Sequence, residues 1–310
     1  MDWRHCTLCP RNCGADRSLK GGICGETNQI RIARAALHFG EEPCIVGQGG
    51  SGTVFFSGCA LKCCFCQNQA ISRDGVGETV SVARLSEIFL ELQSAGAENI
   101  NLVTPSHFAP LVSEALSSVK KRLTIPVVCN CGGYESEEIL RCFDGLVDIY
   151  LPDLKYVSPQ RSLRYSGAED YFAVASSALK EMFRQTGAYV LDAKGTLRKG
   201  MIVRHLVLPG GKKDGVALVR WLSETFPVDS ILFSLMRQYT PAGDLSAVPE
   251  LRRRVYSVEY EAVVEAAVAA GLSGYRQGRG SSTLAMTPAF DFTGVHSRLT
   301  HDKDKAVLKG

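Results

Sequence analysis

The chain has 310 residues, of which 45% are hydrophobic and 22% charged, and its formal net charge is only +3. This length suffices for one large α/β domain with a small appendage, and the small net charge argues against a nucleic-acid-binding surface. No run of about 18 apolar residues is present, and the first residues lack the apolar core of a signal peptide, so we expect no membrane segment and a cytoplasmic location.

Six short segments have the apolar, β-branched composition of buried strands and are bounded by Gly, Pro, Asp or Asn. They are residues 53–58, 99–105, 126–131, 148–154, 202–209 and 229–236. Helical patterns alternate with them, in residues 79–97, 107–121, 134–143, 158–186, 212–225 and 255–270. Residues 187–200 predict an excursion before the fifth strand. Repeated strand–helix units predict a parallel sheet with helices outside, either most of a barrel or an open doubly wound sheet.

Polar side chains follow several of the predicted strands. Ser106 and His107 come after the second strand, Asn130 lies at the end of the third, and Asp153 and Lys155 end the fourth. In parallel α/β folds the reactive residues gather at the C-terminal ends of the strands. We therefore expect the functional site at this edge of the sheet.

Cysteine is abundant in this chain, and in a reduced cytoplasm that abundance favours metal or cluster binding over disulfides. An N-terminal group, rich in nearby Gly and Pro, consists of Cys6, Cys9, Cys13 and Cys24. A second group, directly after the first predicted strand, consists of Cys59, Cys63, Cys64 and Cys66. Cys44 and Cys142 are isolated, and we interpret them as small core hydrophobes.

The second group can be read as Cys59-x3-Cys63-x2-Cys66, with spacers that let one loop wrap a compact polynuclear centre. Thiolates are the standard iron–sulfur ligands. A mononuclear zinc site normally takes four protein ligands, so three close cysteines indicate an iron left open to an exogenous molecule. A closed zinc or iron–sulfur site without catalysis is the alternative. Cys64 is interpreted as a non-ligand, because pairing it with Cys66 across one residue gives poor geometry.

The cysteine motif, with Phe65 directly before its last cysteine, resembles that of the radical S-adenosylmethionine superfamily. The wider runs resemble the branch related to pyruvate formate-lyase activating enzyme; they are GTVFFSGCALKCCFCQNQAIS, CTLCPRNCG, ARAALHFGEEP, DIYLPDLKY, RHLVLPGG and LMRQYTP. The resemblance extends over residues 6–293 and implies a partial (β/α)6 barrel of the TIM type with a 4Fe-4S cluster. It implies that reductive cleavage of S-adenosylmethionine at the cluster gives a 5′-deoxyadenosyl radical, which abstracts hydrogen from a substrate. The protein would position the cofactor and exclude water.

The resemblance also implies partners. An electron donor such as flavodoxin or ferredoxin would reduce the cluster. The substrate would be either a glycyl radical enzyme or a small molecule or other macromolecule. A non-catalytic iron–sulfur electron-transfer or sensor protein is the alternative class, and binding of S-adenosylmethionine at an open iron separates the two.

Five residues outside the cysteines stand at positions where the resemblance implies contacts with the cofactor. Asp153 and Lys155 belong to a DLK run whose aspartate helps to position the cofactor carboxylate, in part through a cation site; a structural salt link between them is the alternative. Arg204 matches an arginine that contacts the same carboxylate, which suits a planar guanidinium. Asn130 is a departure, because it stands where these enzymes have an acidic residue. Phe65 is expected near the adenine or as a loop anchor.

The end of the second strand also departs from the family, which often has a Gly-Gly-Glu type run there for the cofactor amino group. Thr104 and Ser106 still offer oxygen acceptors. His107 is expected either to face the substrate or to cap the next helix. Because His205 alternates with Arg204 along the strand, we expect His205 in the core or at the surface.

The N-terminal cysteines could hold a structural zinc or an auxiliary cluster, and their spacing does not decide between the two. We divide the chain into a Cys-rich metal-binding extension over residues 1–50, a partial barrel over residues 51–297, and a frayed polar tail over residues 298–310.

Overall fold

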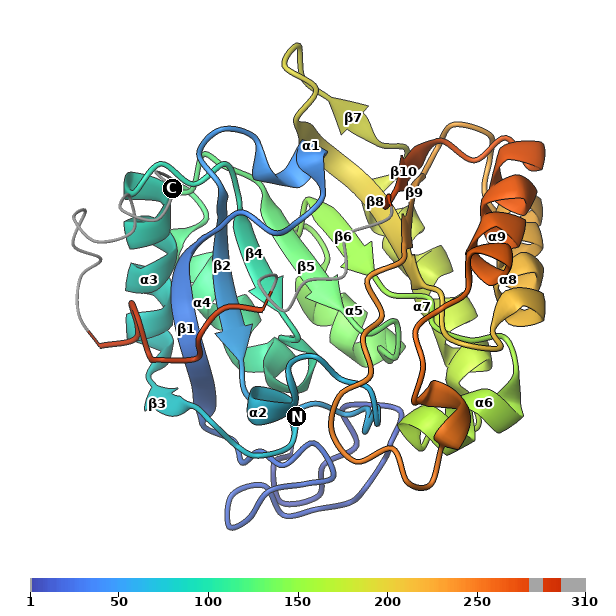
Figure 1. Cartoon of the computed structure of the whole chain (residues 1–310). Coiled ribbons are helices and arrows are strands. Elements are labelled where there is room, and N and C mark those ends of the chain that lie inside the picture. Colours follow the sequence, from blue (N-terminus) through green and yellow to red (C-terminus); the bar gives the residue numbers. More distant parts are fainter. Residues whose placement is uncertain (1, 279–286, 297–310) are drawn as a thin grey trace, which may run out of the picture.

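An open and mostly parallel sheet runs through the computed structural model, which describes residues 2–278 and 287–296 (Figure 1). The hydrogen-bonded order is β10-β9-β8-β6-β5-β4-β2-β1-β3, and β7 pairs with β8. The strands are β1 (Ile30–His38), β2 (Ser51–Phe56), β3 (Glu78–Val80), β4 (Ile100–Val103), β5 (Val127–Cys131), β6 (Ile149–Pro152), β7 (Val190–Leu191), β8 (Leu197–Leu206), β9 (Leu232–Met236) and β10 (Gly274–Arg276). The six strands expected from the sequence are present as β2, β4, β5, β6, β8 and β9. The predicted tail 298–310 lies outside the described residues.

Helices follow the strands in sequence, and the longer ones, such as α3, α4, α7 and α8, cover the outer face of the sheet (Figure 1). They are α1 (Pro43–Val46), α2 (Gln69–Ser72), α3 (Val82–Ser94), α4 (Ala109–Val119), α5 (Glu137–Phe143), α6 (Pro159–Ser166), α7 (Tyr171–Thr186), α8 (Lys212–Thr225) and α9 (Ser257–Ala269), with 3-10 turns η1 (Ser106–Phe108) and η2 (Pro249–Leu251). The single pattern predicted over 158–186 is two helices, because Gly167 adopts φ 63° and ends α6 with a left-handed cap.

The predicted α/β class with a partial barrel is confirmed. β2, β4, β5, β6, β8 and β9 pair in parallel in this spatial order. The apolar side of α3 shows how the outer layer packs: Leu85, Ile88, Phe89 and Leu92 are fully buried. The sheet does not close, since β10 and β3 lie at opposite ends of its order.

β1 was not expected from the sequence, and it extends the sheet beyond β2. It pairs antiparallel with β2 and with β3, with a register shift between Ile32 and Arg34. Its two arginines interrupt the apolar composition that marked the other strands, although Ile30 and Ile32 are buried. Residues 30–38 fall within the predicted N-terminal extension, yet they are part of the main sheet.

The inner face of the sheet is filled at one end by α1. Cys44 and Ile45 of this short helix are buried in a cluster with apolar residues of β5, β6, β8 and β9. The cluster residues are Cys44, Ile45, Val128, Ile149, Leu151, Leu197, Ile202 and Leu232. Cys44 is therefore a small core hydrophobe, as predicted, and Cys142 also packs against the core while remaining partly exposed.

The N-terminal segment lies at the end of the sheet towards which the parallel strands point (Figure 1). Arg17, which is 1% exposed, holds it there. The Arg17 side chain donates to the carbonyls of Glu26 at 3.0 Å, Thr27 at 2.7 Å and His107 at 2.8 Å. One buried guanidinium thus ties the segment to itself and to the turn that follows β4.

Gly58 joins β2 to the cysteine loop at φ 80°, and a Cβ there would meet Glu26 and come within 2.8 Å of the Cys24 carbonyl oxygen. Gly75 has a similar φ of 71°, but its nearest heavy atom would be 4.0 Å from a Cβ. We expect Gly75→Ala to lower the free energy of unfolding by about 1 kcal/mol, the cost of the left-handed conformation. Gly58→Ala should lower it by about 2 kcal/mol or more, because overpacking adds to that cost. Urea unfolding of both apoproteins measures the difference, and equal losses would show that the N-terminal segment does not pack against Gly58 in solution.

Candidate functional site

A pocket of about 210 Å³ opens on the inner face of the sheet near the C-terminal ends of the strands. All five residues expected to contact the cofactor line it, together with two cysteines of the loop; these are Cys63, Phe65, Cys66, Asn130, Asp153, Lys155 and Arg204. They come from the loop after β2 and from β5, β6 and β8. The parallel sheet therefore brings together residues that are up to 141 positions apart, from Cys63 to Arg204.

The cysteine loop is held in place by backbone hydrogen bonds from two sides. The Cys59 N–H donates to the Cys24 carbonyl at 3.0 Å, on the N-terminal segment. On the other side the Cys64 N–H donates to the Tyr165 carbonyl at 2.8 Å, in α6. Because these donors and acceptors belong to the main chain, these contacts leave the cysteine side chains free for other partners.

Three thiols of the loop influence one another electrostatically. Burial raises the pKa of Cys59 to about 12; the negative charges of Cys63 and Cys66 add to the rise, and the Leu61 N–H opposes it. Burial also raises the pKa of Cys63, against the charge of Lys155. Three neighbouring thiolates are thus unfavourable without a cation between them, and a positive metal centre would relieve the repulsion.

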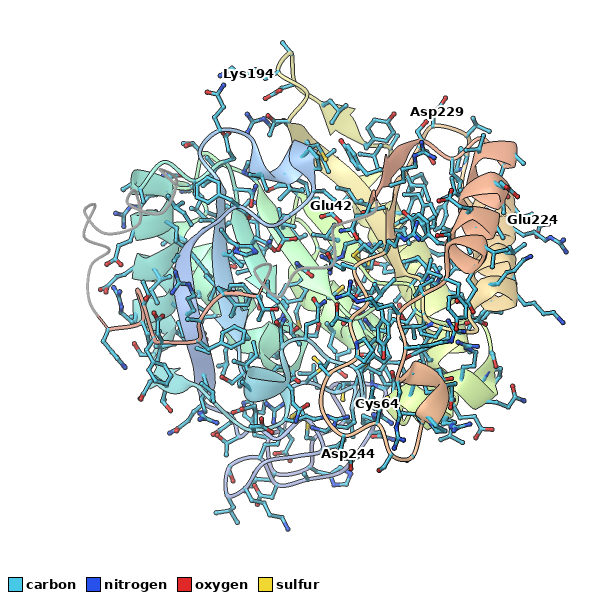
Figure 2. All side chains as sticks on the ribbon, in the orientation of Figure 1. Glu42, Cys64, Lys194, Glu224, Asp229 and Asp244 are labelled. Atoms are coloured by element: carbon cyan, nitrogen blue, oxygen red, sulfur yellow. The ribbon has the colours of Figure 1, made fainter. Side chains whose placement is uncertain are left out.

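Cys64 has different surroundings. Burial raises its pKa, and beyond Cys63 the nearby charges are those of Arg73 and Glu250. In Figure 2 Cys64 lies towards the end of the molecule that carries the N-terminal segment. The non-ligand interpretation of Cys64 stays a prediction.

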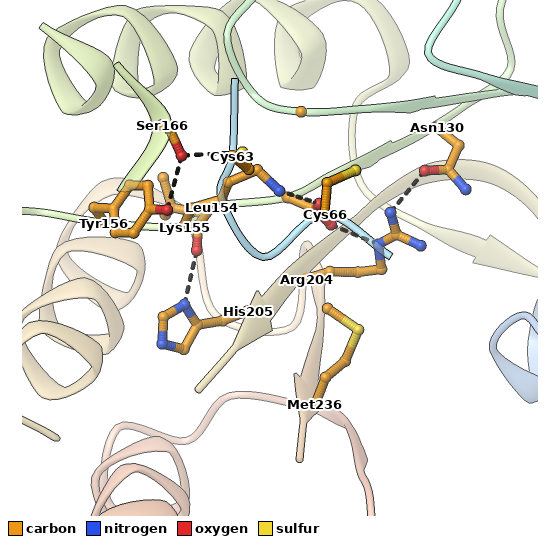
Figure 3. A network of polar contacts seen from close by, with 12 residues as sticks. Cys63, Cys66, Asn130, Leu154, Lys155, Tyr156, Ser166, Arg204, His205 and Met236 are labelled. Atoms are coloured by element: carbon orange, nitrogen blue, oxygen red, sulfur yellow. Dashed lines mark hydrogen bonds and ion pairs between the residues drawn. The ribbon is translucent and has the colours of Figure 1, made fainter. Parts of the chain in front are cut away.

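Asp153, Lys155 and Arg204 form a partly buried ion-pair chain at the pocket wall (Figure 3). The Lys155 Nζ lies 2.5 Å from Asp153 Oδ2, and Arg204 Nε lies 2.9 Å from Asp153 Oδ1. Arg204 Nη2 donates to Asn130 Oδ1 at 2.6 Å. Burial tends to raise the pKa of Asp153, but Arg204 and Lys155 outweigh it and the pKa is lowered. The salt link considered from the sequence is therefore present, and it includes Arg204.

Glu41 lines the pocket, and Glu42 is close enough to Arg204 to feel its charge; neither glutamate was singled out from the sequence. Asn101 Nδ2 donates to Glu41 Oε1 at 3.0 Å, and Glu41 Oε2 lies 3.5 Å from Arg204 Nη1. Burial raises the pKa of both glutamates, and Arg204 opposes the rise. Glu42 Oε2 is buried and has no hydrogen-bond partner among the described residues. The only sequence signal was an acidic pair within a run that matched the family, ARAALHFGEEP, without a spacing that predicts a site.

Phe65 lines the pocket and also anchors the loop. Its ring meets Tyr156 and Tyr239 edge-on, with centroids 6.5 Å and 6.3 Å away. Both expectations for Phe65 are compatible with this position, because one face of the loop packs on aromatic rings while the pocket lies beside it.

The polar residues that follow β4, Thr104, Ser106 and His107, do not line the pocket. Thr104 has φ 59°, an unusual value for a β-branched residue. Ser106 donates from Oγ to Glu135 Oε1 at 2.9 Å, so it acts as a donor rather than as the expected acceptor. His107 is 2% exposed, and its Nε2 lies 2.6 Å from the Ser57 carbonyl oxygen. The His107 ring thus contacts the main chain at the start of the cysteine loop and does not face the pocket.

His205 is buried on the opposite side of β8 from Arg204. Its Nδ1 lies 2.8 Å from the Leu154 carbonyl oxygen (Figure 3). The expectation that the two residues point to different sides is confirmed, and His205 is a core histidine.

The N-terminal cysteines lie close enough to influence one another. Burial raises the pKa of Cys9 to about 11, and the charges of Cys24, Cys6 and Cys13 all add to the rise. Among residues 2–278 and 287–296, however, no group of three or more His, Cys, Asp or Glu side chains has the arrangement of a site for a single metal ion.

Comparisons with known proteins bear on the cysteine loop. Residues 45–162 match the family model for a 4Fe-4S single cluster domain, and this segment contains Cys59, Cys63 and Cys66. This match agrees with the 4Fe-4S cluster that the sequence resemblance implies. An uncharacterized protein of Methanocaldococcus jannaschii is 26% identical over 275 residues, which cover 86% of this chain and 75% of that protein.

Two solved structures are similar at low identity. Streptococcus suis SuiB bound to the precursor peptide SuiA has a TM-score of 0.48 and 13% identity, covering 73% of this chain and 48% of SuiB. A domain of pyruvate-formate lyase-activating enzyme from Bacteroides vulgatus has a TM-score of 0.40 and 14% identity, and the match covers 56% of this chain and 94% of that domain. The chain thus spans about half the length of SuiB, and with TM-scores below 0.5 we base no argument on these structures. No helix of the described residues is long and apolar enough to cross a membrane.

The buried position of His107 predicts a pH dependence of stability. Burial and then the charge of Arg17 lower its pKa to about 3, although the Ser57 carbonyl opposes the shift. The folded-state pKa lies below the unfolded value, so the contribution of His107 is fully present above about pH 6.5 and is lost as the pH falls towards 3. When the pH falls from 7 to 5, we expect the free energy of unfolding of the wild-type apoprotein to decrease by about 2 kcal/mol more than that of His107→Gln. The glutamine keeps a neutral donor at this position. Urea unfolding at both pH values tests this, and equal losses would contradict the neutral, buried state of His107.

Proposed function

We propose that this chain is a radical S-adenosylmethionine enzyme in which Cys59, Cys63 and Cys66 hold a 4Fe-4S cluster. The observation that carries the proposal is the meeting of this cysteine loop with the Asp153–Arg204 ion pair at one pocket. A metal centre held by these three thiolates would leave a coordination position for an exogenous molecule.

The residues present fit such a cluster. Cysteine is the standard ligand for iron–sulfur centres, and the three thiols are free, mutually repulsive as thiolates and largely removed from water. When bound, the cluster would supply the electron for reductive cleavage of S-adenosylmethionine, whose 5′-deoxyadenosyl radical abstracts hydrogen from a substrate.

The chain's own groups would bind and orient that cofactor. Arg204 already uses Nε on Asp153 and Nη2 on Asn130, while its Nη1 has only a long contact of 3.5 Å to Glu41. Nη1 is therefore the donor best placed to bind the cofactor carboxylate, and Asp153 keeps the guanidinium plane fixed. Phe65, at the same pocket, offers an apolar ring for the adenine.

We further propose an activating-enzyme-like role, in which the hydrogen is taken from a protein partner of the glycyl radical type and a flavodoxin- or ferredoxin-like protein donates the electron. The support is the sequence resemblance over residues 6–293. A small-molecule substrate is the other outcome of the test. If S-adenosylmethionine does not bind or is not cleaved, a non-catalytic iron–sulfur electron-transfer or sensor protein is indicated instead.

We also keep the N-terminal cysteines, Cys6, Cys9, Cys13 and Cys24, as a proposed second metal site for zinc or an iron–sulfur cluster. Support comes from the mutual influence of the four thiols and from Cys24, whose carbonyl accepts the hydrogen bond of the Cys59 N–H. This site would stabilise the segment that covers the cysteine loop.

Cysteine variants test the proposed ligands. Replacing Cys59, Cys63 or Cys66 by Ala should abolish the 4Fe-4S spectrum of the anaerobically reconstituted protein and the cleavage of S-adenosylmethionine, because each removes one of three iron ligands. Cys64→Ala is the matched control and should retain both. Iron analysis, electron paramagnetic resonance and mass spectrometry for 5′-deoxyadenosine are the measurements.

Full cluster loss in the Cys64 variant would refute this ligand assignment. The triple variant of Cys59, Cys63 and Cys66 serves a second purpose, since any zinc or iron that it retains after purification must be held elsewhere. A metal-free triple variant would refute the N-terminal site.

Arg204→Lys tests the cofactor contact, because lysine keeps the charge but loses the planar pair of donors. Affinity for S-adenosylmethionine should fall roughly tenfold or more, since hydrogen bonds to charged groups are worth about 1.5–3 kcal/mol. Asp153→Asn should weaken binding as well, and the cluster should form in both variants. Arg237→Lys is the matched control; its side chain is as buried as that of Arg204, 14% exposed, but it pairs with Glu261. Calorimetric titration of reconstituted protein showing unchanged affinity in the Arg204 and Asp153 variants would refute their assigned roles.

A further inference from the structure

Two serine hydroxyls reach the sulfur atoms of the cysteine loop. Ser166 Oγ lies 3.0 Å from Cys63 Sγ, and Ser72 Oγ donates to Cys66 Sγ at 3.3 Å. Ser166 ends α6 and is fully buried, whereas Ser72 ends α2 and is 8% exposed. Two separate elements thus present one hydroxyl each to two of the three proposed ligands.

The direction of the Ser166 contact follows from the chemistry of a ligand cysteine. A cysteine bound to iron has lost its proton, so its sulfur can only accept a hydrogen bond. Ser166 must then donate its single proton to Cys63. Tyr156 Oη, 2.8 Å from Ser166 Oγ, must in turn donate to Ser166 (Figure 3). The result is a buried chain from Tyr156 through Ser166 to Cys63, in which each hydrogen bond polarises the next.

We propose that Ser166 and Ser72 are positioning residues that raise the reduction potential of the cluster by donating hydrogen bonds to Cys63 and Cys66. The inference rests on the proposed function, because it requires these cysteines to be cluster ligands. Uptake of one electron from a reductant increases the negative charge of the centre, and part of that charge resides on the ligand sulfurs. A hydroxyl donor stabilises the more negative state more strongly, so it makes reduction easier.

The side chain of Ser166 can be removed without releasing the loop. Its backbone carbonyl accepts the Lys62 N–H at 3.2 Å and Arg11 Nη2 at 3.1 Å, and both contacts survive a change to alanine. The Ser166 hydroxyl, by contrast, has Cys63 and Tyr156 as its partners. Structural support and the contact to sulfur are thus separable at this residue.

A redox titration of the reconstituted protein, monitored by electron paramagnetic resonance without S-adenosylmethionine, tests the proposal. In Ser166→Ala the ratio of reduced to oxidised cluster at a fixed solution potential should fall about threefold or more. Ser72→Ala should change the ratio in the same direction, and the double variant should show roughly the sum of the two shifts in potential.

Ser162→Ala is the matched control. Ser162 lies in the same helix and is 1% exposed, but its hydroxyl donates to the carbonyls of Pro159 and Glu169 rather than to sulfur. The midpoint potential of the cluster in Ser162→Ala should equal that in the wild type. A purely structural role of buried serine hydroxyls would instead leave the potential unchanged in all single variants.

If Ser166→Ala does not hold a cluster, Tyr156→Phe tests the effect of the Ser166 hydrogen bond on the reduction potential. It leaves Ser166 in place and removes only the hydroxyl that orients it, so a smaller fall of the same sign is expected. Unchanged potentials in Tyr156→Phe and Ser72→Ala, with the cluster present, would overturn the proposal. Failure of the wild type to form any cluster would instead refute the proposed function, and iron analysis distinguishes these outcomes.

Discussion

The pairing of β6 with β8 is the constraint on which the candidate site depends. These strands are 51 positions apart in register, with Ile149 opposite Gly200 and Asp153 opposite Arg204. The Leu154 N–H donates to the Arg204 carbonyl at 2.8 Å. The backbone pairing therefore places the side chains of Asp153 and Arg204 beside each other, independently of their charges. The ion pair between Asp153 and Arg204 lies at the end of this strand pairing, at the edge of the pocket. A change in register by one residue would direct Arg204 to the helix layer, where His205 now lies.

Around Arg204, negatively charged side chains outnumber positively charged ones. Asp153, Glu41 and Glu42 face Arg204 and Lys155 in this part of the inner face. Isolated buried charges are costly, and loss of one partner leaves the others uncompensated. Burial raises the pKa of both glutamates, and the charge of Arg204 opposes the rise. This network favours a fixed arrangement of Arg204 over flexibility.

The N-terminal segment supports the cysteine loop of the site. It reaches the cysteine loop through Cys24, and Arg11 donates from Nε to the Ala60 carbonyl at 2.8 Å. The loop is therefore held between this segment and α6, and Cys63, Phe65 and Cys66 line the pocket. Such main-chain support leaves the cysteine and serine side chains available for a metal centre, which is consistent with a loop that has its final path before the centre is bound.

Local sequence determined the elements and the chemistry of the loop. Short β-branched runs predicted six strands, and the spacing of Cys59, Cys63 and Cys66 predicted a compact centre, because both signals lie within a few neighbouring residues. The placement of Asp153 and Arg204 at one pocket followed from the resemblance and from the rule that parallel strands end at the same edge. β1 was missed because its arginines mask an antiparallel strand whose partner, β2, lies further along the chain.

Only the tertiary structure decided the contacts that depend on distant elements. Glu41 reaches Arg204 across 163 positions, Ser166 reaches Cys63 across 103, and His107 braces Ser57 rather than facing the pocket. No local pattern encodes these contacts, because each depends on the packing of separate elements against the same sheet. Composition and spacing determine which groups the chain contains, whereas the fold determines which of them meet and in what orientation.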